Sequence, residues 1–530
     1  MSRTAVLGAL LTGVLVTAGC STVPGNPIAA QNKVPFYSAV LDLMTQSVVR
    51  YTGTGATGGN WDISATSGGE ALGKITEAGQ QTEVLTLGDK TYVKPPQNVL
   101  LSNLPAGMDA ASVAGRWVTG NPDLAAVPAG NLKPHDLAGA LMTALRQTID
   151  FPRDGDPTAR VRVGNEDALQ VETPAGVLAV TEKAPYRVLR LDPTPESTSW
   201  TGDSEIGAQI PDSGAIVFGL LSPTDRDRAY DDLVAATQSL HNALNIGIEL
   251  DFNRSGNIDC SDTACTVTVN VTSSATATNG ATVTGSVAAT MQATVTVDGQ
   301  PAAGCSAAQT IPINGSGVLS CVDGSVAPIV AGIKARKQAE ADAQAQAQGR
   351  DVTITYSIPY NASVQVQALA TAQAEIDKAV GGIRNQQNAI RNLPPYRQVP
   401  YNSDDLSRAA LQARNAAGAD NAKNVAVARV PNWNDPKTGP LIIGMSTGPG
   451  NYAEQDIAKQ LIERGFTPEQ ITELYSERQP CTTCGPMLEQ QLGSTVPVTY
   501  SIPWSDDNQT AVAAADVLKL LIEQAGGTTK

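Results

Sequence analysis

The chain has 530 residues, of which 42% are hydrophobic and only 4% aromatic. This length indicates three or four domains, and the small, weakly aromatic residue set suits β-rich exported domains better than a large metabolic enzyme. The formal net charge of −15 argues against broad electrostatic attraction to nucleic acid or anionic lipid, although it leaves room for a local basic groove.

The N-terminus predicts a lipoprotein signal peptide, residues 1–19. Arg3 supplies the positive charge, and the apolar run 5–16 is too short to span a bilayer. The sequence Thr-Ala-Gly that ends at Cys20 resembles a lipobox, in which the peptide is cut before the cysteine and lipid is attached to it. An ordinary secretory signal with an incidental cysteine is the alternative. We expect Cys20 to anchor the protein, through residues 20–34 as a tether, at the outer side of the cell membrane.

A domain is predicted at residues 35–200, because apolar and polar side chains alternate with a period of two from residue 35 to about residue 191. Examples are residues 83–87 and 187–191, and turn signals such as Gly-Asp at 88–89 separate such runs. This pattern predicts an antiparallel sheet. Residues 135–149 have helical spacing.

Three features of this region carry a resemblance. They are the lipobox, the run Gly73–Lys94 that ends in GDKTYVK, and the triplet Arg-Trp-Val at 116–118. Together they resemble the mycobacterial LppX/LprG-type lipoproteins. The resemblance implies an α+β domain with a curved sheet closed by helices, like a half-barrel, and an acyl lipid bound in its cavity. A spacer that holds the rest of the chain off the membrane is the alternative.

The middle of the chain predicts a linker with a helix at 201–247, followed by a small β domain at 248–325. Short alternating strands and hairpin signals such as Asn-Gly at 279–280 suggest a β-sandwich. In an exported protein we expect its four cysteines to form two disulfides. These are Cys260, Cys265, Cys305 and Cys321, and their pairing is open among three connectivities, although the last two flank a hairpin.

Residues 326–401 are rich in Ala and Gln, and we expect a helical spacer. The helical runs are 333–348 and 364–380, and the Pro-Pro pair at 394–395 marks a boundary. The remaining residues, 402–530, predict alternating helices and strands of an α/β domain. The expected helices are 404–417, 452–464, one that opens at Pro480, and 511–523; the expected strands are 424–430, 440–446, 470–475 and 496–502.

This order of elements, with two motifs, resembles the cytidine-deaminase-like fold and is closest to the bacterial polymorphic-toxin deaminases. One motif is Ala-Glu at 453–454, and the other is Glu-Arg-Gln-Pro-Cys-Thr-Thr-Cys at 477–484. The resemblance implies that Cys481 and Cys484 bind zinc, which activates water, and that Glu454 shuttles protons. It implies hydrolytic deamination of a base in a nucleic acid or nucleotide, and a cognate immunity protein as partner.

The residue types suit this chemistry, with one departure. Cys481 and Cys484 would sit at a helix N-terminus, which favours thiolates, and their spacing directs both sulfurs to one metal. The family's histidine position falls on Tyr452, so the third ligand is the Tyr452 phenolate, Asp456 or a group that does not align. A phenol has an ordinary pKa of about 10, which a bound metal can lower. A disulfide between Cys481 and Cys484 is the alternative to a zinc site.

Two functions follow from these patterns. In the first, a lipid-anchored N-terminal half presents a deaminase toxin, which is released at 326–401. In the second, the protein is a lipid-binding lipoprotein of the cell envelope, and its C-terminal domain is catalytically inactive.

Overall fold

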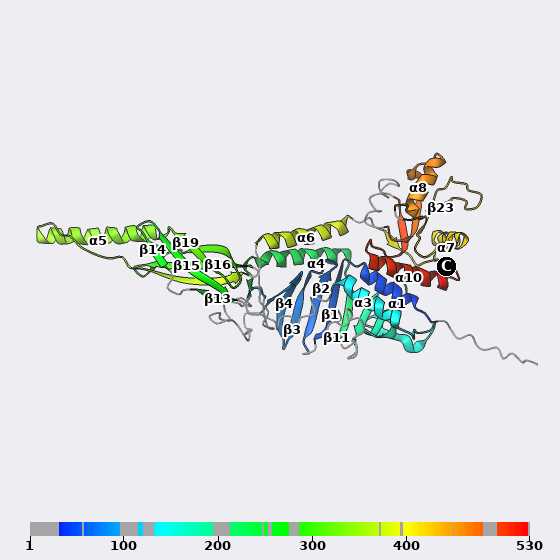
Figure 1. The fold of residues 1–530 in the computed structure, drawn as a ribbon, viewed down its shortest axis with the longest axis horizontal. Helices are drawn as coiled ribbons and strands as arrows, with labels where there is room; N and C mark the ends of the chain where they lie inside the picture. Colours follow the sequence, from blue (N-terminus) through cyan, green and yellow to red (C-terminus); the bar gives the residue numbers. More distant parts are fainter. Residues whose placement is uncertain are drawn as a thin grey trace, which may run out of the picture.

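The computed structural model describes residues 31–55, 58–95, 115–119, 132–193, 213–245, 249–252, 257–274, 286–369, 373–392, 396–448, 450–480 and 496–527. The predicted lipidation residue Cys20 and the predicted zinc ligands Cys481 and Cys484 therefore lie outside the described residues. Figure 1 shows an elongated molecule with three parts, whose described helices are all too short or too polar to cross a membrane.

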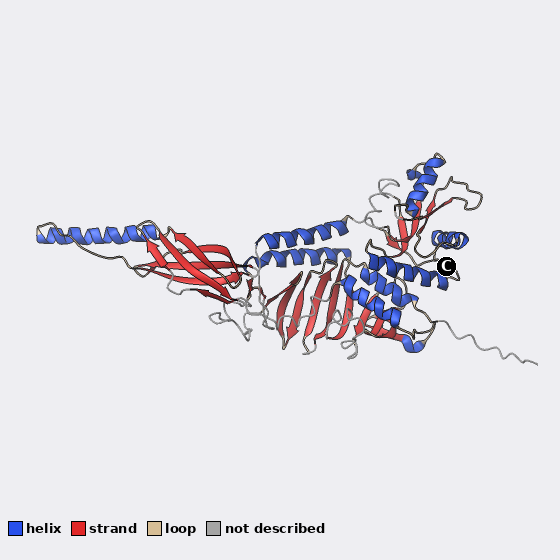
Figure 2. Ribbon diagram, in the orientation of Figure 1, coloured by secondary structure: helices blue, strands red, loops and turns tan. Residues whose placement is uncertain are grey.

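The N-terminal domain is built on one long antiparallel sheet (Figure 2). Its strands lie side by side in the order β6-β5-β4-β3-β2-β1-β11-β10-β9-β8-β7. Their bounds are β1 Val48–Gly55, β2 Asn60–Thr66, β3 Ala71–Glu77, β4 Gln80–Leu87, β5 Lys90–Lys94, β6 Val118–Thr119, β7 Arg160–Val163, β8 Glu166–Thr173, β9 Gly176–Thr181, β10 Val188–Asp192 and β11 Ser213–Leu220. The predicted multidomain α+β architecture with large antiparallel sheets is confirmed.

Helices cover both faces of this sheet. They are α1 (Val34–Met44), α3 (Pro134–Gln147), α4 (Pro223–Gln238) and α6 (Gln373–Arg391). Val49 and Tyr51 of β1 share a core with α1 and α3, whereas Val48 belongs to the core formed with α4 and α6. Successive side chains of a strand point to opposite faces, so β1 contributes to both cores.

The predicted linker at 201–247 contains a strand that the sequence analysis missed. β11 pairs with β1 and β10 and closes the gap between them. Ile216 and Phe218 are buried, while Val217 between them is exposed. This is a period-two pattern, but it follows a stretch rich in Pro, Ser and Thr that predicts a linker. The helix predicted after it is present as α4.

The central domain consists of two sheets that share one core. The first sheet holds β13 (Glu249–Phe252), β14 (Asn257–Cys260), β15 (Cys265–Ser274) and β19 (Ser316–Asp323). The second is an extension of the N-terminal sheet and holds β16 (Ser286–Val297), β17 (Gln300–Pro301), β18 (Cys305–Pro312) and β20 (Tyr360–Leu369). Val267 and Val269 of β15 meet Met291 and Val295 of β16 in this core.

Both predicted disulfides are present in the central domain. Cys260 bonds to Cys265 and closes the hairpin of β14 and β15. Cys305 bonds to Cys321 and joins β18 of one sheet to β19 of the other. The second bridge therefore links the two layers of the domain covalently.

The interval 326–401, predicted to be a helical spacer, is helical only in part. α5 (Val326–Gln348) extends away from the strands (Figure 1), but residues 360–369 form β20, which pairs with β16 along its length. The alternation of Val364 and Val366 with polar residues is a strand pattern, which the high Ala and Gln content of the interval obscures. α6 then packs on α4 through Ile376, Val380 and Ile383, so it is part of the N-terminal domain and not a stalk.

The central domain is inserted into the N-terminal domain. The short strand β12 (Leu244–Asn245) lies between β6 and β20, and Leu244 pairs with Leu369. The chain therefore leaves the N-terminal domain and returns to it at neighbouring points. It then continues through α6 to the C-terminal domain.

The C-terminal domain has a five-stranded sheet in the order β21-β25-β24-β22-β23. Its elements are β21 (Arg397–Gln398), α7 (Asp405–Ala417), β22 (Val425–Arg429), β23 (Leu441–Met445), α8 (Ala453–Glu463), β24 (Glu473–Arg478), β25 (Val498–Ile502) and α10 (Asn508–Gln524). The helix expected to open at Pro480 falls outside the described residues. β24 begins three residues later than predicted, because a 3-10 turn at 468–470 precedes it.

Helices α7 and α8 cover opposite faces of this sheet. Leu406 and Ala410 of α7 pack on Tyr475 of β24, and Ile457 of α8 packs on Leu474 of the same strand. Side chains of β24 therefore point alternately to α7 and to α8. The same alternation directs the side chain of Ser476 toward α8 and that of Glu477, the first residue of the predicted motif, toward α7.

We predict that Asp42→Asn stabilises the chain at neutral pH. Burial in α1 raises the pKa of Asp42 from 3.8 to about 6, although Arg187 opposes the rise. Above pH 6 the folded chain holds a charge that costs up to about 3 kcal/mol relative to the unfolded chain. Calorimetry should show a higher Tm for Asp42→Asn at pH 7.5, and a gain that shrinks as pH falls toward 4.

The control is Asp62→Asn, which removes an exposed carboxylate paired with Arg50. Surface pairs contribute about 0–1 kcal/mol, so this variant should be slightly less stable at pH 7.5. An equal gain in both variants, or a gain for Asp42→Asn that does not depend on pH, would contradict the burial argument.

Candidate active site

The predicted proton-shuttling residue, Glu454, is the second residue of α8, and its side chain is buried. Its Oε1 accepts a hydrogen bond of 2.7 Å from Ser476 Oγ on β24 and one of 3.3 Å from Asn424 Nδ2, just before β22. Burial raises the pKa of Glu454, and these two hydrogen bonds oppose the rise. Glu454 is thus a carboxyl group with a raised pKa at a helix N-terminus, the setting expected of a group that accepts and returns protons.

Asn424 is held in one orientation. Its Oδ1 accepts the backbone N–H of Arg478 at 3.2 Å, so its Nδ2 faces Ser476 Oγ at 2.9 Å and Glu454. The backbone N–H of Asn424 donates to Ser446 Oγ at 2.7 Å. The Asn424 amide is already fixed by these hydrogen bonds. It can therefore bind the ionised carboxylate of Glu454 without a further loss of its own conformational entropy.

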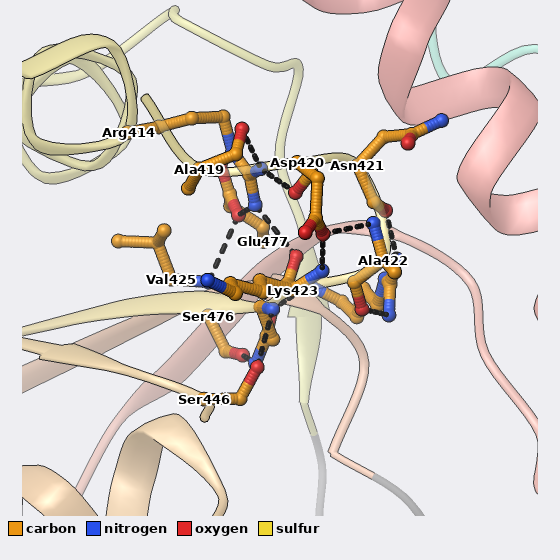
Figure 3. Close-up of polar contacts among 12 residues, drawn as sticks. Arg414, Ala419, Asp420, Asn421, Ala422, Lys423, Val425, Ser446, Ser476 and Glu477 are labelled. Carbon is orange, nitrogen blue, oxygen red and sulfur yellow. Dashed lines mark hydrogen bonds and ion pairs between the residues drawn. The ribbon is translucent and has the colours of Figure 1, made fainter. Parts of the chain in front are cut away.

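On the opposite face of β24, Glu477 forms a fully buried ion pair with Arg414 of α7 (Figure 3). Arg414 Nε donates to Glu477 Oε1 at 2.8 Å, and Arg414 Nη2 donates to Oε2. The backbone N–H of Val425 and the hydroxyl of Tyr401 also donate to this carboxylate, at 2.9 and 2.8 Å. The remaining N–H groups of Arg414 reach backbone carbonyls, among them that of Asp420 at 2.7 Å. The pair therefore has the partners that a buried ion pair needs.

Arg478, the next residue, holds the turn between α7 and β22. Its guanidinium donates to the carbonyls of Asn421 and Ala422, at 2.5 and 2.9 Å, and stacks on Trp504 at 4.6 Å from the ring centre. Burial lowers the pKa of Arg478 to about 10, so it remains a cation at neutral pH. The Glu-Arg pair of the predicted motif thus holds α7, through Glu477, and the turn between α7 and β22, through Arg478.

The described residues place the two candidate third ligands differently. Tyr452 is the N-cap residue of α8, two residues before Glu454, and its backbone N–H donates to Gln455 Oε1 at 3.2 Å. Asp456 instead accepts the backbone N–H of Met445 at 3.2 Å, which turns its carboxylate toward the end of β23. Asp456 is therefore engaged at β23, whereas Tyr452 lies at the N-terminus of α8.

Cys481 and Cys484 lie outside the described residues, which end at Pro480 on this side. Within the described ranges, no three His, Cys, Asp or Glu side chains form a group that could hold a metal ion. The structure does bring Glu454 onto Ser476, five residues before Cys481 and on the strand that leads into the Cys-x-x-Cys motif. The Ala-Glu start of α8 is therefore adjacent to β24, the strand that precedes the Cys-x-x-Cys sequence.

Three further parts of this site are not predicted from the sequence: Asn424, Ser476 and Arg414. Asn424 and Ser476 are common residue types without a motif. A signal for Arg414 exists, because an arginine on the apolar face of a helix needs a buried acid, and Glu477 is the acid of the motif.

The comparison with protein families agrees with this geometry. Residues 421–520 match the family model of Xanthomonas-like deaminases, so the C-terminal domain is a deaminase domain as the sequence predicts. No curated protein matches the chain.

We predict that Glu477→Gln destabilises the C-terminal domain by about 3–5 kcal/mol, because it leaves the charge of Arg414 buried without its counterion. Thermal or chemical unfolding should show an earlier transition for this domain. Glu473→Gln is the matched control on the same strand, since Glu473 pairs with Arg429 at the surface. The control should change stability by less than about 1 kcal/mol; equal effects would show that burial of the pair does not matter.

We predict that Ser476→Ala raises the pKa of Glu454 further. The hydrogen bond from Ser476 stabilises the ionised carboxylate and lowers the pKa of Glu454, so the midpoint should rise when the hydroxyl is removed. The measurement is a titration of the carboxyl carbon by NMR. Ser501→Ala removes a buried hydroxyl that contacts Tyr475 instead, and should leave the midpoint in place. A midpoint that does not move in Ser476→Ala would exclude the assigned hydrogen bond.

Proposed function

We propose that the C-terminal domain is a zinc-dependent deaminase that hydrolyses the amino group of a base in a nucleic acid or nucleotide. The observation that carries the proposal is the buried Glu454 at the start of α8, bonded to the strand that leads into Cys481 and Cys484. The match of residues 421–520 to a deaminase family supports it.

The donor set suits zinc. Two thiolates, from Cys481 and Cys484, are preferred zinc ligands, and a catalytic zinc takes three protein ligands and leaves one position for water. Tyr452 is the third ligand in this proposal, because it stands at the family's ligand position and Asp456 is turned toward Met445. Bound zinc supplies a nucleophilic water at neutral pH.

Glu454 supplies the proton transfers. It accepts a proton from the water as oxygen adds to the ring carbon that carries the amino group. It donates that proton to the ring nitrogen, then accepts the proton of the new hydroxyl group as the carbonyl forms and passes it to the amino group, which leaves as ammonia when the carbon–nitrogen bond breaks. Asn424 and Ser476 both donate to Oε1 of Glu454, which holds the carboxyl group in place during both transfers.

The deaminase domain is proposed as a toxin effector on a membrane-anchored lipoprotein. Acylation of Cys20 would hold the chain at the outer side of the cell membrane, and a cognate immunity protein would protect the producer. The net charge of residues 402–530 is −5, from ten Lys and Arg and fifteen Asp and Glu. This favours a single base or strand in a narrow pocket over nonspecific binding to a duplex.

A second candidate function is a lipid-binding lipoprotein with an inactive deaminase domain. A cleft of about 940 Å³ lies between α4 and the sheet. Val48, Leu72, Trp117 and Leu233 supply apolar lining, and charged groups such as Lys74 lie beside them. This mixed lining suits an amphiphile such as an acylated lipid of the LppX/LprG type. Tyr452 in place of the family's histidine favours an inactive domain.

We predict that Glu454→Gln abolishes deamination and keeps zinc, because the carboxylate moves protons and does not bind the metal. The loss should be about 10²–10⁴-fold. Cys481→Ser should lose zinc, and Tyr452→Phe should lose zinc and activity together if the phenolate is a ligand. The measurements are the zinc content of the purified chain from residue 21 onward, and deaminated bases in DNA, RNA and free nucleotides incubated with it.

The matched control is Glu463→Gln at the other end of α8, where the side chain is exposed and should not affect turnover. Wild-type chain that binds no zinc and leaves no deaminated product in any of these pools would exclude the enzyme and leave the lipid-binding function.

A further inference from the structure

The last helix of the deaminase domain, α10, lies between that domain and the N-terminal domain (Figure 1). On one side it is held to its own domain, where Asn421 Nδ2 donates to the carbonyl of Ala515 at 3.2 Å. On the other side it packs along α1. α10 therefore belongs to two domains at once.

The apolar residues of α10 belong to the core of the N-terminal domain. Ala513, Ala514, Val517, Leu518 and Ile522 are all buried in the same cluster as the apolar residues of α1 and α3. Two further parts of the deaminase domain, Leu411 of α7 and Ile502 of β25, join this cluster. Burial of several large aliphatic side chains stabilises such a contact by about 1.5–3 kcal/mol each, before the entropic cost of association.

Polar contacts border this apolar patch along α3. His135 Nε2 lies 2.9 Å from Asp507 Oδ1 at the start of α10, and Arg146 donates twice to Asp516 Oδ2, at 3.0 and 2.8 Å. Between them, a Cβ built on Gly139 would lie only 2.0 Å from Gln509 Nε2, so glycine gives this side chain room. The three contacts follow one another in the same order along both helices, which fixes the register of the deaminase domain on α1 and α3.

We propose that the face formed by α1 and α3 is a docking site for the deaminase domain, and that it holds this domain without a covalent link. After the chain is cut between Arg391 and Arg397, the deaminase domain stays bound to the N-terminal domain through α10. Cleavage of the chain is therefore not sufficient to release the deaminase domain. The contacts of α10 with α1 and α3 must also be broken. This docking requires neither zinc nor catalysis. It can therefore be tested independently of the proposed deaminase activity.

The test replaces residues 393–395 with a site for a sequence-specific protease, in the full chain from residue 21 onward. The cut wild-type protein should elute as one complex in size-exclusion chromatography at micromolar concentration. Gly139→Trp combined with Arg146→Glu should separate the two fragments, because the first change fills the space of Gln509 and the second places like charges together. Both changes lie in the N-terminal domain, so they leave the sequence of the released domain intact.

Two further variants make the result specific. Arg146→Glu alone should weaken binding of the fragments by about tenfold, and Arg146→Glu with Asp516→Arg should restore it, because the pair is reversed. Arg162→Glu is the matched control, with the same change of charge at an exposed arginine of β7. The proposal is overturned if the cut wild-type fragments separate at micromolar concentration, or if the charge reversal weakens binding no more than the control.

Discussion

The buried ion pair of Arg414 and Glu477 is the interaction on which the candidate active site depends. It joins α7 to β24 across the sheet, and its carboxylate also binds the first backbone N–H of β22. Two charges taken out of water are tolerable only where every donor and acceptor finds a partner. The pair therefore admits one arrangement of α7, β22 and β24, and any shift of β24 by one residue would bury Ser476 or Arg478 against α7.

This register determines the chemistry on the other face of β24. With Glu477 directed to α7, Ser476 points toward α8 and reaches Glu454. Asn424 connects the two sides, because its backbone lies next to Val425 while its amide binds Ser476 and Glu454. The register of one strand therefore places a buried ion pair on one face of the sheet and a buried carboxyl group with a raised pKa on the other. Glu477 and Arg478, which precede the Cys-x-x-Cys sequence, therefore have a structural role: they hold the elements around β24 in place.

The sequence predicts the deaminase domain well because its elements are short, amphipathic and separated by turn residues. Asp404 and Gly418 mark both ends of α7, and the Ala-Glu start of α8 was placed within one residue. What the sequence could not show are contacts between distant positions. Arg414 and Glu477 are 63 residues apart, and periodicity identifies an apolar face but not the partner of that face. The strands at 213–220 and 360–369 were missed because composition outweighed a weak alternation.

The architecture also determines where the deaminase domain is connected to the rest of the chain. The sequence predicts a helical spacer at 326–401, but β20 pairs with β16 of the central domain and α6 completes the core over α4. A cut within α5 would leave β20 paired with β16 and α6 packed on α4, so the downstream domain would remain attached through both. The chain passes from the N-terminal domain to the deaminase domain after Arg391, and α10 then returns to the core of the N-terminal domain. Because the central domain is inserted between β12 and α6, the N-terminal domain contacts both of the other domains. It is therefore the framework that holds the central domain and the deaminase domain in place.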